Sequence, residues 1–218
     1  MLSIAIDGPS GAGKSTIAKT VAEKLGITYI DTGAMYRAVA LEMTDSGIDV
    51  NDAKSVIHTL DGISIKLEHI DGTQHIFLNG KDVSARIREH AVSKAASDVS
   101  KIPEVRLKLV EMQRKIAEEK DVIMDGRDIG SYVLPNATYK FYLTASAEIR
   151  ARRRFKELTE KGQTVEYDKI YRDICDRDYN DMNRSFAPLV KTDDAILVDS
   201  SDLTVEEVAQ TILGKIKK

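Results

Sequence analysis

The stretch Gly8-Pro9-Ser10-Gly11-Ala12-Gly13-Lys14-Ser15 fits the pattern G-x-x-x-x-G-K-[ST] at every fixed position. The apolar run 2–6 before it is typical of a buried strand. After it, apolar residues recur at the spacing of a buried helix face, at Ile17, Ala18, Val21, Ala22 and Leu25. The sequence therefore predicts a strand, a glycine-rich turn and a helix in succession, which is the context that this pattern requires.

The residue types of this loop suit a polyphosphate. Glycines let the backbone approach phosphate oxygens closely and adopt positive φ angles. The loop N–H groups and the helix N-terminus offer partial positive charge. Lys14 is predicted to contact the β- and γ-phosphates, and the Ser15 hydroxyl to coordinate Mg²⁺. The predicted triphosphate site consists of Gly8, Pro9, Ser10, Gly11, Ala12, Gly13, Lys14, Ser15 and Thr16.

The composition is typical of a soluble globular protein, with 42% hydrophobic and 31% charged residues among 218. The net charge of −3 argues against a general nucleic-acid binder. Cys175 is the single cysteine, which excludes an internal disulfide and favours a reducing compartment. No stretch has the length and hydrophobicity of a signal peptide or a membrane span. We therefore expect a cytoplasmic protein without a membrane partner.

Strands and helices are predicted to alternate along most of the chain. Apolar runs predict strands at 27–30, 122–124, 139–143 and 195–198. Helices are predicted after Thr32, which we expect to be the N-cap, and over 50–60, 89–100, 103–120 and 205–216. Gly26 is the expected C-cap of the first helix. This order predicts an α/β fold.

The pattern changes between residues 63 and 83. Strictly alternating residues predict a strand at 63–67. A turn at Asp71-Gly72 separates it from a second predicted strand at 75–78, and residues 81–83 could start a third. We interpret this region as a small antiparallel sheet inserted into the α/β chain. His69 and His75 are expected to face each other across the hairpin, but two histidines without a further ligand do not predict a metal site.

Charged residues follow the strand at 122–124, in Asp125-Gly126-Arg127-Asp128. Such charges at the end of a core strand cost free energy unless they bind something, so we favour a ligand site over a structural salt-bridge cluster. Arginines are dense at 150–154, and acidic and basic residues alternate from about 166 to 184. Two arginine-bearing helices joined by a turn at 162–164 suit a lid over a nucleotide, although a salt-bridged exposed helix has the same pattern.

Together these motifs resemble those of bacterial cytidylate kinases, which are nucleoside monophosphate kinases of the P-loop class. The resemblance covers nearly the whole chain. It rests on Asp7-Gly8-Pro9-Ser10-Gly11-Ala12-Gly13-Lys14-Ser15, Asp31-Thr32-Gly33-Ala34-Met35-Tyr36-Arg37, Asp125-Gly126-Arg127-Asp128-Ile129-Gly130, and Arg177-Asp178 followed by Asn183-Arg184 and Ala187-Pro188-Leu189. Many kinases share the first motif, and the others in this order are more specific.

The resemblance implies a P-loop NTPase-type parallel sheet flanked by helices, with a small antiparallel insertion and a helical lid. We expect one kinase unit over 1–218. Its core would comprise 1–31, 101–148 and 186–218, its monophosphate-binding region 32–100, and the lid with the following helix 149–185.

The resemblance further implies Mg²⁺-assisted, in-line phosphoryl transfer from ATP to CMP or dCMP by a monomer. It assigns the CMP phosphate to Arg37, Arg127 and Arg184, the ribose to Thr32, Arg177 and Asp181, and cytosine to Ser97, Arg106 and Asp128. Tyr36 is a further expected substrate contact. The expected catalytic residues are Lys14, Arg127 and Arg184. The lid arginines would be Arg150, Arg152, Arg153 and Arg154, and among them we assign Arg153 to ATP.

Elementary chemistry agrees with the role of Asp128. A carboxylate can accept a hydrogen bond from the amino group of cytosine, whereas it repels the carbonyl oxygen that uracil carries there. Phosphoryl transfer itself requires mainly positioning and positive charge, so we expect no general base.

Three other functions remain as alternatives. A regulatory GTPase would need a guanine-reading Asn-Lys-x-Asp, and the nearest string, Asn79-Gly80-Lys81-Asp82, has the wrong order. A kinase for UMP or AMP would share the fold and the loop. A nucleic-acid-binding module is suggested only by the arginines at 150–154, and it would show steeply salt-dependent affinity.

Overall fold

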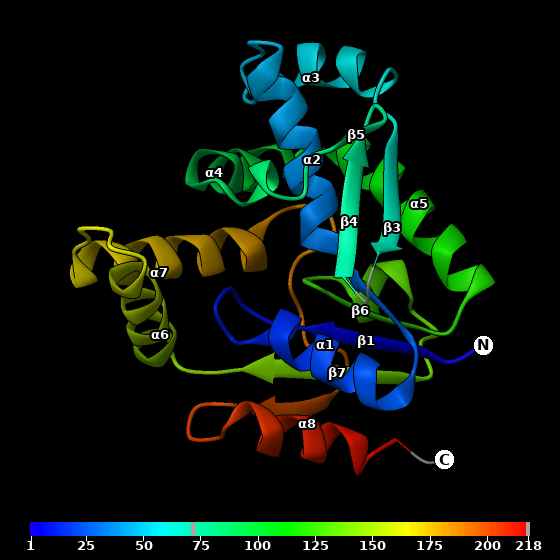
Figure 1. Ribbon diagram of the computed structural model, residues 1–218, viewed down its shortest axis with the longest axis vertical. Coiled ribbons are helices and arrows are strands. Elements are labelled where there is room, and N and C mark those ends of the chain that lie inside the picture. The colour runs from blue at the N-terminus through cyan, green and yellow to red at the C-terminus, as the bar shows by residue number, and fades with distance from the viewer. Residues whose placement is uncertain (71–72, 217–218) are drawn as a thin grey trace. The chain divides into compact units, whose positions relative to one another are not determined.

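A computed structural model describes residues 1–70 and 73–216, and the chain divides into two compact units (Figure 1). Unit 1 comprises residues 1–29 and 119–218, and unit 2 comprises residues 30–118. The turn predicted at Asp71-Gly72 lies outside the described residues.

A parallel sheet carries unit 1. Its strands are β1 (Ser3–Asp7), β6 (Val122–Gly126), β7 (Tyr139–Thr144) and β8 (Ile196–Asp199), and β2 (Thr28–Asp31), within which the boundary of the units falls, lies at one edge. The order is β2-β6-β1-β7-β8, with β1 parallel to β6 and β7, and β7 parallel to β8. Asp7 lies opposite Gly126 of β6, so the phosphate loop and the 125–128 segment leave the sheet at neighbouring carboxyl ends. The predicted parallel α/β fold is confirmed.

Two helices of unit 1 complete the core around this sheet. Helices α1 (Lys14–Leu25) and α8 (Val205–Leu213) pack against each other and contribute buried apolar side chains. The core includes Ile4, Ile6, Ile17, Val21, Ile123, Phe141, Leu143, Val198, Val208 and Ile212. Gly26 ends α1 as predicted, with a φ of 67° and its N–H directed at the carbonyls of Ala22 and Glu23. Apolar burial therefore fixes the helix that begins at the phosphate loop.

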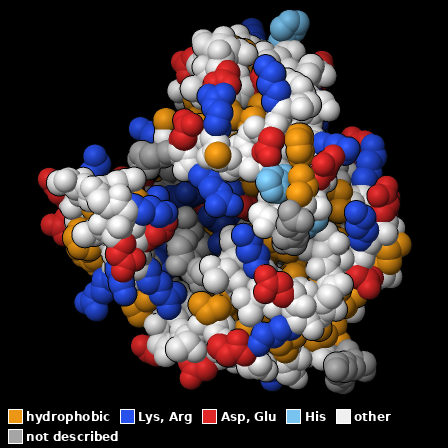
Figure 2. Space-filling view, viewed as in Figure 1, with side chains coloured by type: hydrophobic (Ala, Val, Ile, Leu, Met, Phe, Trp, Pro, Cys, Tyr) orange, Lys and Arg blue, Asp and Glu red, His pale blue; other side chains and the backbone are white. Residues whose placement is uncertain are grey.

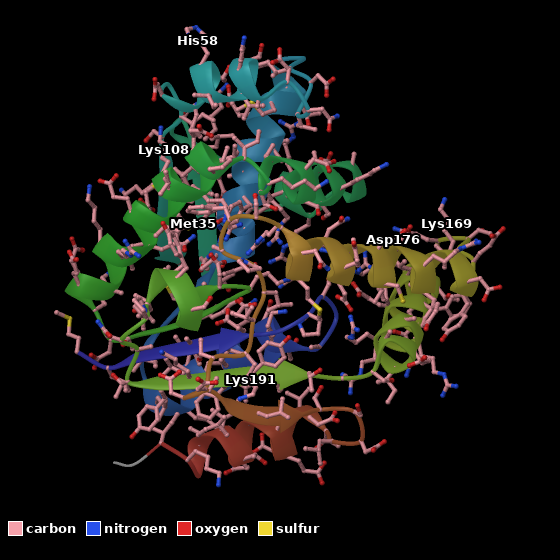
Figure 3. All side chains as sticks on the ribbon, turned by 180° about the vertical axis from the view of Figure 1, so that it is seen from behind. Met35, His58, Lys108, Lys169, Asp176 and Lys191 are labelled. Carbon is pink, nitrogen blue, oxygen red and sulfur yellow. The ribbon has the colours of Figure 1, made fainter. Side chains whose placement is uncertain are left out.

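The other helices of unit 1 are α6 (Ala147–Glu160) and α7 (Tyr167–Asn183), with the short π-helical turn η2 (Ile129–Val133) after β6. Helices α6 and α7 pack on each other through a small apolar cluster of Ala151, Leu158, Ile170 and Ile174. Lys169 and Asp176 lie on the exposed side of α7 (Figure 3). The predicted pair of helices is confirmed, and its use as a lid stays a prediction.

Unit 2 is built around α2 (Thr32–Asp45), which packs against α3 (Ala53–Leu60), the 3₁₀ turn η1 (Arg86–Arg88) and α4 (His90–Val99). The long helix α5 (Pro103–Glu119) begins at the predicted proline. Met35 of α2 is fully buried, and its sulfur lies 3.7 Å from Nε2 of Gln113 on α5 (Figure 3). A single apolar cluster thus joins α2 and α5.

The predicted N-cap of α2 was wrong. Asp31, not Thr32, caps the helix, because its carboxylate accepts the N–H of Ala34 at 2.9 Å. Thr32 is the first helical residue and is buried. An aspartate in this position also complements the positive end of the helix dipole, which favours it over threonine.

The inserted sheet consists of β3 (Ile65–Ile70), β4 (Thr73–Leu78) and β5 (Lys81–Asp82), in the predicted antiparallel order. The expected pairing of His69 with His75 was wrong. His75 lies opposite Glu68 and His69 opposite Gln74, so the two histidines project from opposite faces of the hairpin. His75 instead contacts Asp82, with Nδ1 2.8 Å from a carboxylate oxygen.

Among the described residues, no helix is both long and apolar enough to cross a membrane.

Candidate active site

The two glycines that the sequence pattern fixes in the phosphate loop of unit 1, Gly8 and Gly13, have backbone angles that favour glycine. Gly8 has a φ of 148°, and a Cβ on it would lie 1.9 Å from the carbonyl oxygen of Leu143. Gly13, the residue before α1, has a φ of 91°. Because larger residues avoid such angles, the glycines of the sequence pattern are needed for the shape of the loop.

Lys14, the first residue of α1, reaches back to the backbone of this loop. Its side chain is buried, and Nζ donates a hydrogen bond to the carbonyl oxygen of Pro9 at 2.7 Å. Burial and the nearby charge of Arg127 lower the pKa of Lys14 well below its usual range, while Asp125 and Asp181 act in the opposite direction. An anion arriving beside the ammonium group would stabilise its charged form.

Ser15 and Asp125 form the candidate magnesium site. The Ser15 hydroxyl donates to a carboxylate oxygen of Asp125 at 2.9 Å, and the Tyr29 hydroxyl donates to the other oxygen at 2.8 Å. Within residues 1–70 and 73–216, no three His, Cys, Asp or Glu side chains gather as a metal-binding group. One hydroxyl and one carboxylate nevertheless fit Mg²⁺, which prefers oxygen ligands and takes most of its shell from water and phosphate.

Asp181 on α7 gathers the predicted phosphate-binding arginines of unit 1. Arg127 donates from Nε to one of its oxygens at 2.7 Å, and an Arg184 nitrogen lies 3.8 Å from the other. Burial alone would raise the pKa of Asp181, but Arg127, Arg177 and Arg184 hold it below its usual range. These guanidinium groups therefore form one cationic cluster that a carboxylate keeps in order.

Asp128 joins the same cluster. It is buried directly after Arg127, and one of its oxygens lies 3.5 Å from a guanidinium nitrogen of Arg184. Arg184 is also held by its own chain, since Nε donates to the carbonyl of Ala187 at 2.7 Å. The motifs at 125–128 and 177–184 are thereby brought together within unit 1.

Arg150 also belongs to this site, although the sequence did not distinguish it from the other arginines of 150–154. Its buried guanidinium donates to the carbonyl oxygens of Ser10 at 3.0 Å and Ala145 at 2.9 Å, and to the carboxylate of Asp178 at 2.6 Å. It thus connects the phosphate loop with α6 and α7. The helical period could have placed Arg150 on the buried face with Ala151, but the loop carbonyl that it binds has no sequence signal.

Arg153, the predicted ATP contact, is held by the segment after β8. Its guanidinium donates to the carbonyl of Ser200 at 2.5 Å and to the Ser200 hydroxyl at 3.2 Å. That hydroxyl in turn donates to the carbonyl of Ala12 in the phosphate loop at 3.1 Å. Other arginines of the run stay at the surface, and basic side chains are conspicuous over α6 and α7 in Figure 2.

Unit 2 holds the remaining predicted substrate residues. Arg37 donates to Asp31 at 2.7 Å, so the carboxylate that caps α2 also orients this guanidinium. Arg106 of α5 is 1% exposed, and its guanidinium carbon lies 5.4 Å from the centre of the Tyr36 ring. An Arg106 nitrogen donates to the carbonyl of Ser100 at 3.2 Å, and the Ser100 hydroxyl donates to the carbonyl of Ser97 at 2.8 Å.

Comparison with known proteins identifies relatives along the whole chain. A family model described as cytidylate kinase matches residues 4–218. A cytidylate kinase of Caldicellulosiruptor saccharolyticus is 54% identical over 212 residues, which cover 97% of this chain and 94% of the relative. A cytidylate kinase of Clostridioides difficile is 51% identical over 215 residues, covering 99% and 98%.

Solved structures share the fold at low sequence identity. A shikimate kinase from Bacteroides thetaiotaomicron aligns with a TM-score of 0.50 at 15% identity, covering 98% of this chain and 96% of that one. A gluconokinase from Sinorhizobium meliloti 1021 aligns with a TM-score of 0.51 at 13% identity, covering 98% and 90%. The sheet and its flanking helices therefore share the fold of these two structures.

Proposed function

The chain belongs to the cytidylate kinase family, and on this premise we propose that it transfers the γ-phosphoryl group of ATP to CMP or dCMP. The observation that carries the proposal is the cationic cluster of unit 1, in which Lys14 follows the phosphate loop and Arg127 and Arg184 surround Asp181. The names of the relatives supply the acceptor.

The loop and the cluster suit the two phosphate groups that must react. The loop N–H groups and Lys14 would bind the triphosphate, and Arg127 and Arg184 would neutralise the acceptor phosphate and the transferring group. An acceptor phosphate entering the cluster would compete with Asp181 for the same guanidinium N–H groups. Positioning and charge would then provide most of the rate enhancement, without a general base.

Ser15 and Asp125 would hold Mg²⁺, which when bound neutralises charge on the β- and γ-phosphates. The Ser15 hydroxyl is the proposed direct ligand, and Asp125 would orient it or accept from a metal-bound water. Arg150 and Ser200 would keep the loop in shape through its carbonyl oxygens. Arg153 is proposed to contact ATP.

The remaining substrate contacts are assigned as the family pattern suggests. Arg37 would bind the acceptor phosphate, Thr32, Arg177 and Asp181 the ribose, and Ser97, Arg106 and Asp128 the base, with Tyr36 as a further substrate contact. In this proposal, residues 32–100 bind the monophosphate and residues 149–185 act as the lid. We further propose that the enzyme works as a monomer in the cytoplasm.

A panel of acceptors tests the proposed function. Initial rates of ADP formation would be measured with ATP, Mg²⁺ and either CMP, dCMP, UMP or AMP. We expect kcat/KM for CMP or dCMP to exceed that for UMP about tenfold or more, because a mismatched polar group at a buried carboxylate costs ~1–3 kcal/mol. Faster turnover of UMP or AMP would contradict the proposal.

A further inference from the structure

We propose that Asp7 is a positioning residue for acceptor use: its carboxylate fixes the segment that carries Arg127 and Asp128 to the strand that leads into the phosphate loop. The inference rests on the proposed function, because it concerns the acceptor-binding residues of that site. Asp7 would act mainly through the backbone that it binds, beside its charge interactions with Asp128 and Lys14.

The carboxylate of Asp7 makes two hydrogen bonds to distant backbone. Its Oδ1 accepts the N–H of Ile129 at 2.8 Å, and its Oδ2 accepts the N–H of Gly130 at 2.7 Å. Asp7 is 5% exposed, so water does not compete freely for these groups. Two parallel bonds to consecutive N–H groups determine the orientation of the bound segment as well as its distance.

The bound segment is the one that presents Asp128. Ile129 and Gly130 begin the π-helical turn η2, and the carbonyl oxygen of Asp128 accepts the N–H groups of Tyr132 at 2.9 Å and Val133 at 3.0 Å. The backbone on the C-terminal side of Asp128 is therefore fixed by Asp7. On the N-terminal side, Gly126 is paired with Asp7 in the sheet register. Arg127 and Asp128 lie between these two attachments.

The space around the carboxylate leaves little room for a change. A Cβ on Gly130 would lie 3.3 Å from Oδ2 of Asp7 and 3.1 Å from Cδ of Lys140. Burial raises the pKa of Asp7 to about 6, partly offset by the two backbone hydrogen bonds, so a charge at this place costs free energy. A neutral asparagine would carry a lower desolvation cost, but it offers one acceptor oxygen and would turn an amide N–H₂ toward a backbone donor.

These contacts predict that a change at Asp7 affects KM for the acceptor more than KM for ATP. Displacement of Arg127 and Asp128 weakens acceptor binding and misaligns the acceptor phosphate, whereas α1 and the glycines of the loop keep their own packing. We therefore expect Asp7→Asn to raise KM for the acceptor about tenfold and to lower kcat, with KM for ATP changed less than about twofold. A purely structural role would change both Michaelis constants together or neither.

A matched control exists at the opposite ends of the same strands. The carboxylate of Asp121 also accepts a backbone N–H, that of Leu2 directly before β1, at 2.7 Å. Unlike Asp7, Asp121 is exposed, and it lies directly before β6. Asp121→Asn removes a comparable carboxylate without touching the 125–130 segment. It should leave both Michaelis constants and kcat at their wild-type values.

The experiment measures KM and kcat for both substrates in wild type, Asp7→Asn and Asp121→Asn, with folding checked by circular dichroism. An acceptor-selective rise in Asp7→Asn alone supports the inference; unchanged constants, or equal rises for ATP and acceptor, overturn it. If Asp7→Asn does not fold, Gly130→Ala replaces it, because the added Cβ would crowd the hydrogen bond between the Gly130 N–H and Asp7. The same acceptor-selective rise in KM is then expected. The acceptor is whichever monophosphate the wild type uses fastest, so a preference for UMP would refute the proposed function and still leave this test decisive.

Discussion

Arg106 of unit 2 is held by other means than the arginines of unit 1, whereas Arg37 of unit 2 is paired with a carboxylate, that of Asp31, as they are. In unit 1, Arg127, Arg150 and Arg184 contact the carboxylates of Asp181, Asp178 and Asp128. In unit 2, Arg106 is enclosed by an apolar helix packing and lies against the Tyr36 ring. Carboxylates can be exchanged for phosphates, whereas an aromatic ring defines a flat surface for a planar group. The difference indicates that the arginines paired with carboxylates manage charge, whereas Arg106 recognises shape.

The largest effect should follow from removing the buried cation of unit 1. Lys14→Ala is expected to lower kcat by a factor of about 100 to 1,000 with CMP, dCMP and UMP alike, because charge stabilisation at the transferring group is lost whatever the acceptor. Steady-state kinetics with all three acceptors measures this. Lys19→Ala, which removes an exposed lysine of the same helix, is the control. An acceptor-dependent loss in Lys14→Ala would refute the proposal that Lys14 stabilises the transferring group whatever the acceptor.

A second prediction uses the opposite behaviour of two carboxylates in unit 1. Burial raises the pKa of Asp7 from 3.8 to about 6, so the folded state binds more protons than the unfolded state between these values. Stability therefore falls as the pH rises through this window, by at most about 3 kcal/mol. Burial would also raise the pKa of Asp181, but its three arginines lower it overall, so its contribution is lost only at more acid pH.

Between about pH 4 and 6, the difference in stability between wild type and Asp7→Asn therefore reports the titration of Asp7. Urea unfolding followed by circular dichroism at pH 4, 5 and 6 should show the wild type losing stability relative to Asp7→Asn as the pH rises. Asp121→Asn controls for the removal of one carboxylate. Parallel pH profiles of Asp7→Asn and wild type would show that Asp7 is ionised equally in the folded and unfolded states.

Next in size is the effect of Asp128, where charge and base recognition coincide. Asp128→Ala is expected to lower kcat/KM for CMP about ten- to a hundredfold, because the amino group of cytosine loses its acceptor and Arg184 loses a partner. Kd for ATP should stay the same, and the preference for CMP over UMP should shrink. Titration calorimetry with ATP and kinetics with both monophosphates test this. Equal loss of ATP and CMP binding would contradict the assignment.

The sequence predicted the features that depend on neighbours in the chain. The glycine loop, the Gly26 cap, the start of α5 at Pro103 and the hairpin insertion each have a local signal, and each is confirmed. Long-range contacts were missed, because Arg150 binds a carbonyl 140 residues away and Asp7 an N–H 122 residues away. The histidine pairing was wrong because alternation in sequence does not fix the register between strands.

The smallest effect should come from Arg106 of unit 2, where a conservative change alters shape and keeps charge. Arg106→Lys retains the cation but loses the planar guanidinium that lies against Tyr36, 5.4 Å from its ring centre. We expect KM for CMP to rise roughly three- to tenfold, with KM for ATP and kcat nearly unchanged. Arg114→Lys, at an exposed position of the same helix, is the matched control and should have no effect. A fall in kcat as large as that of Lys14→Ala would mean that Arg106 acts on the reacting phosphates through its charge rather than on the base.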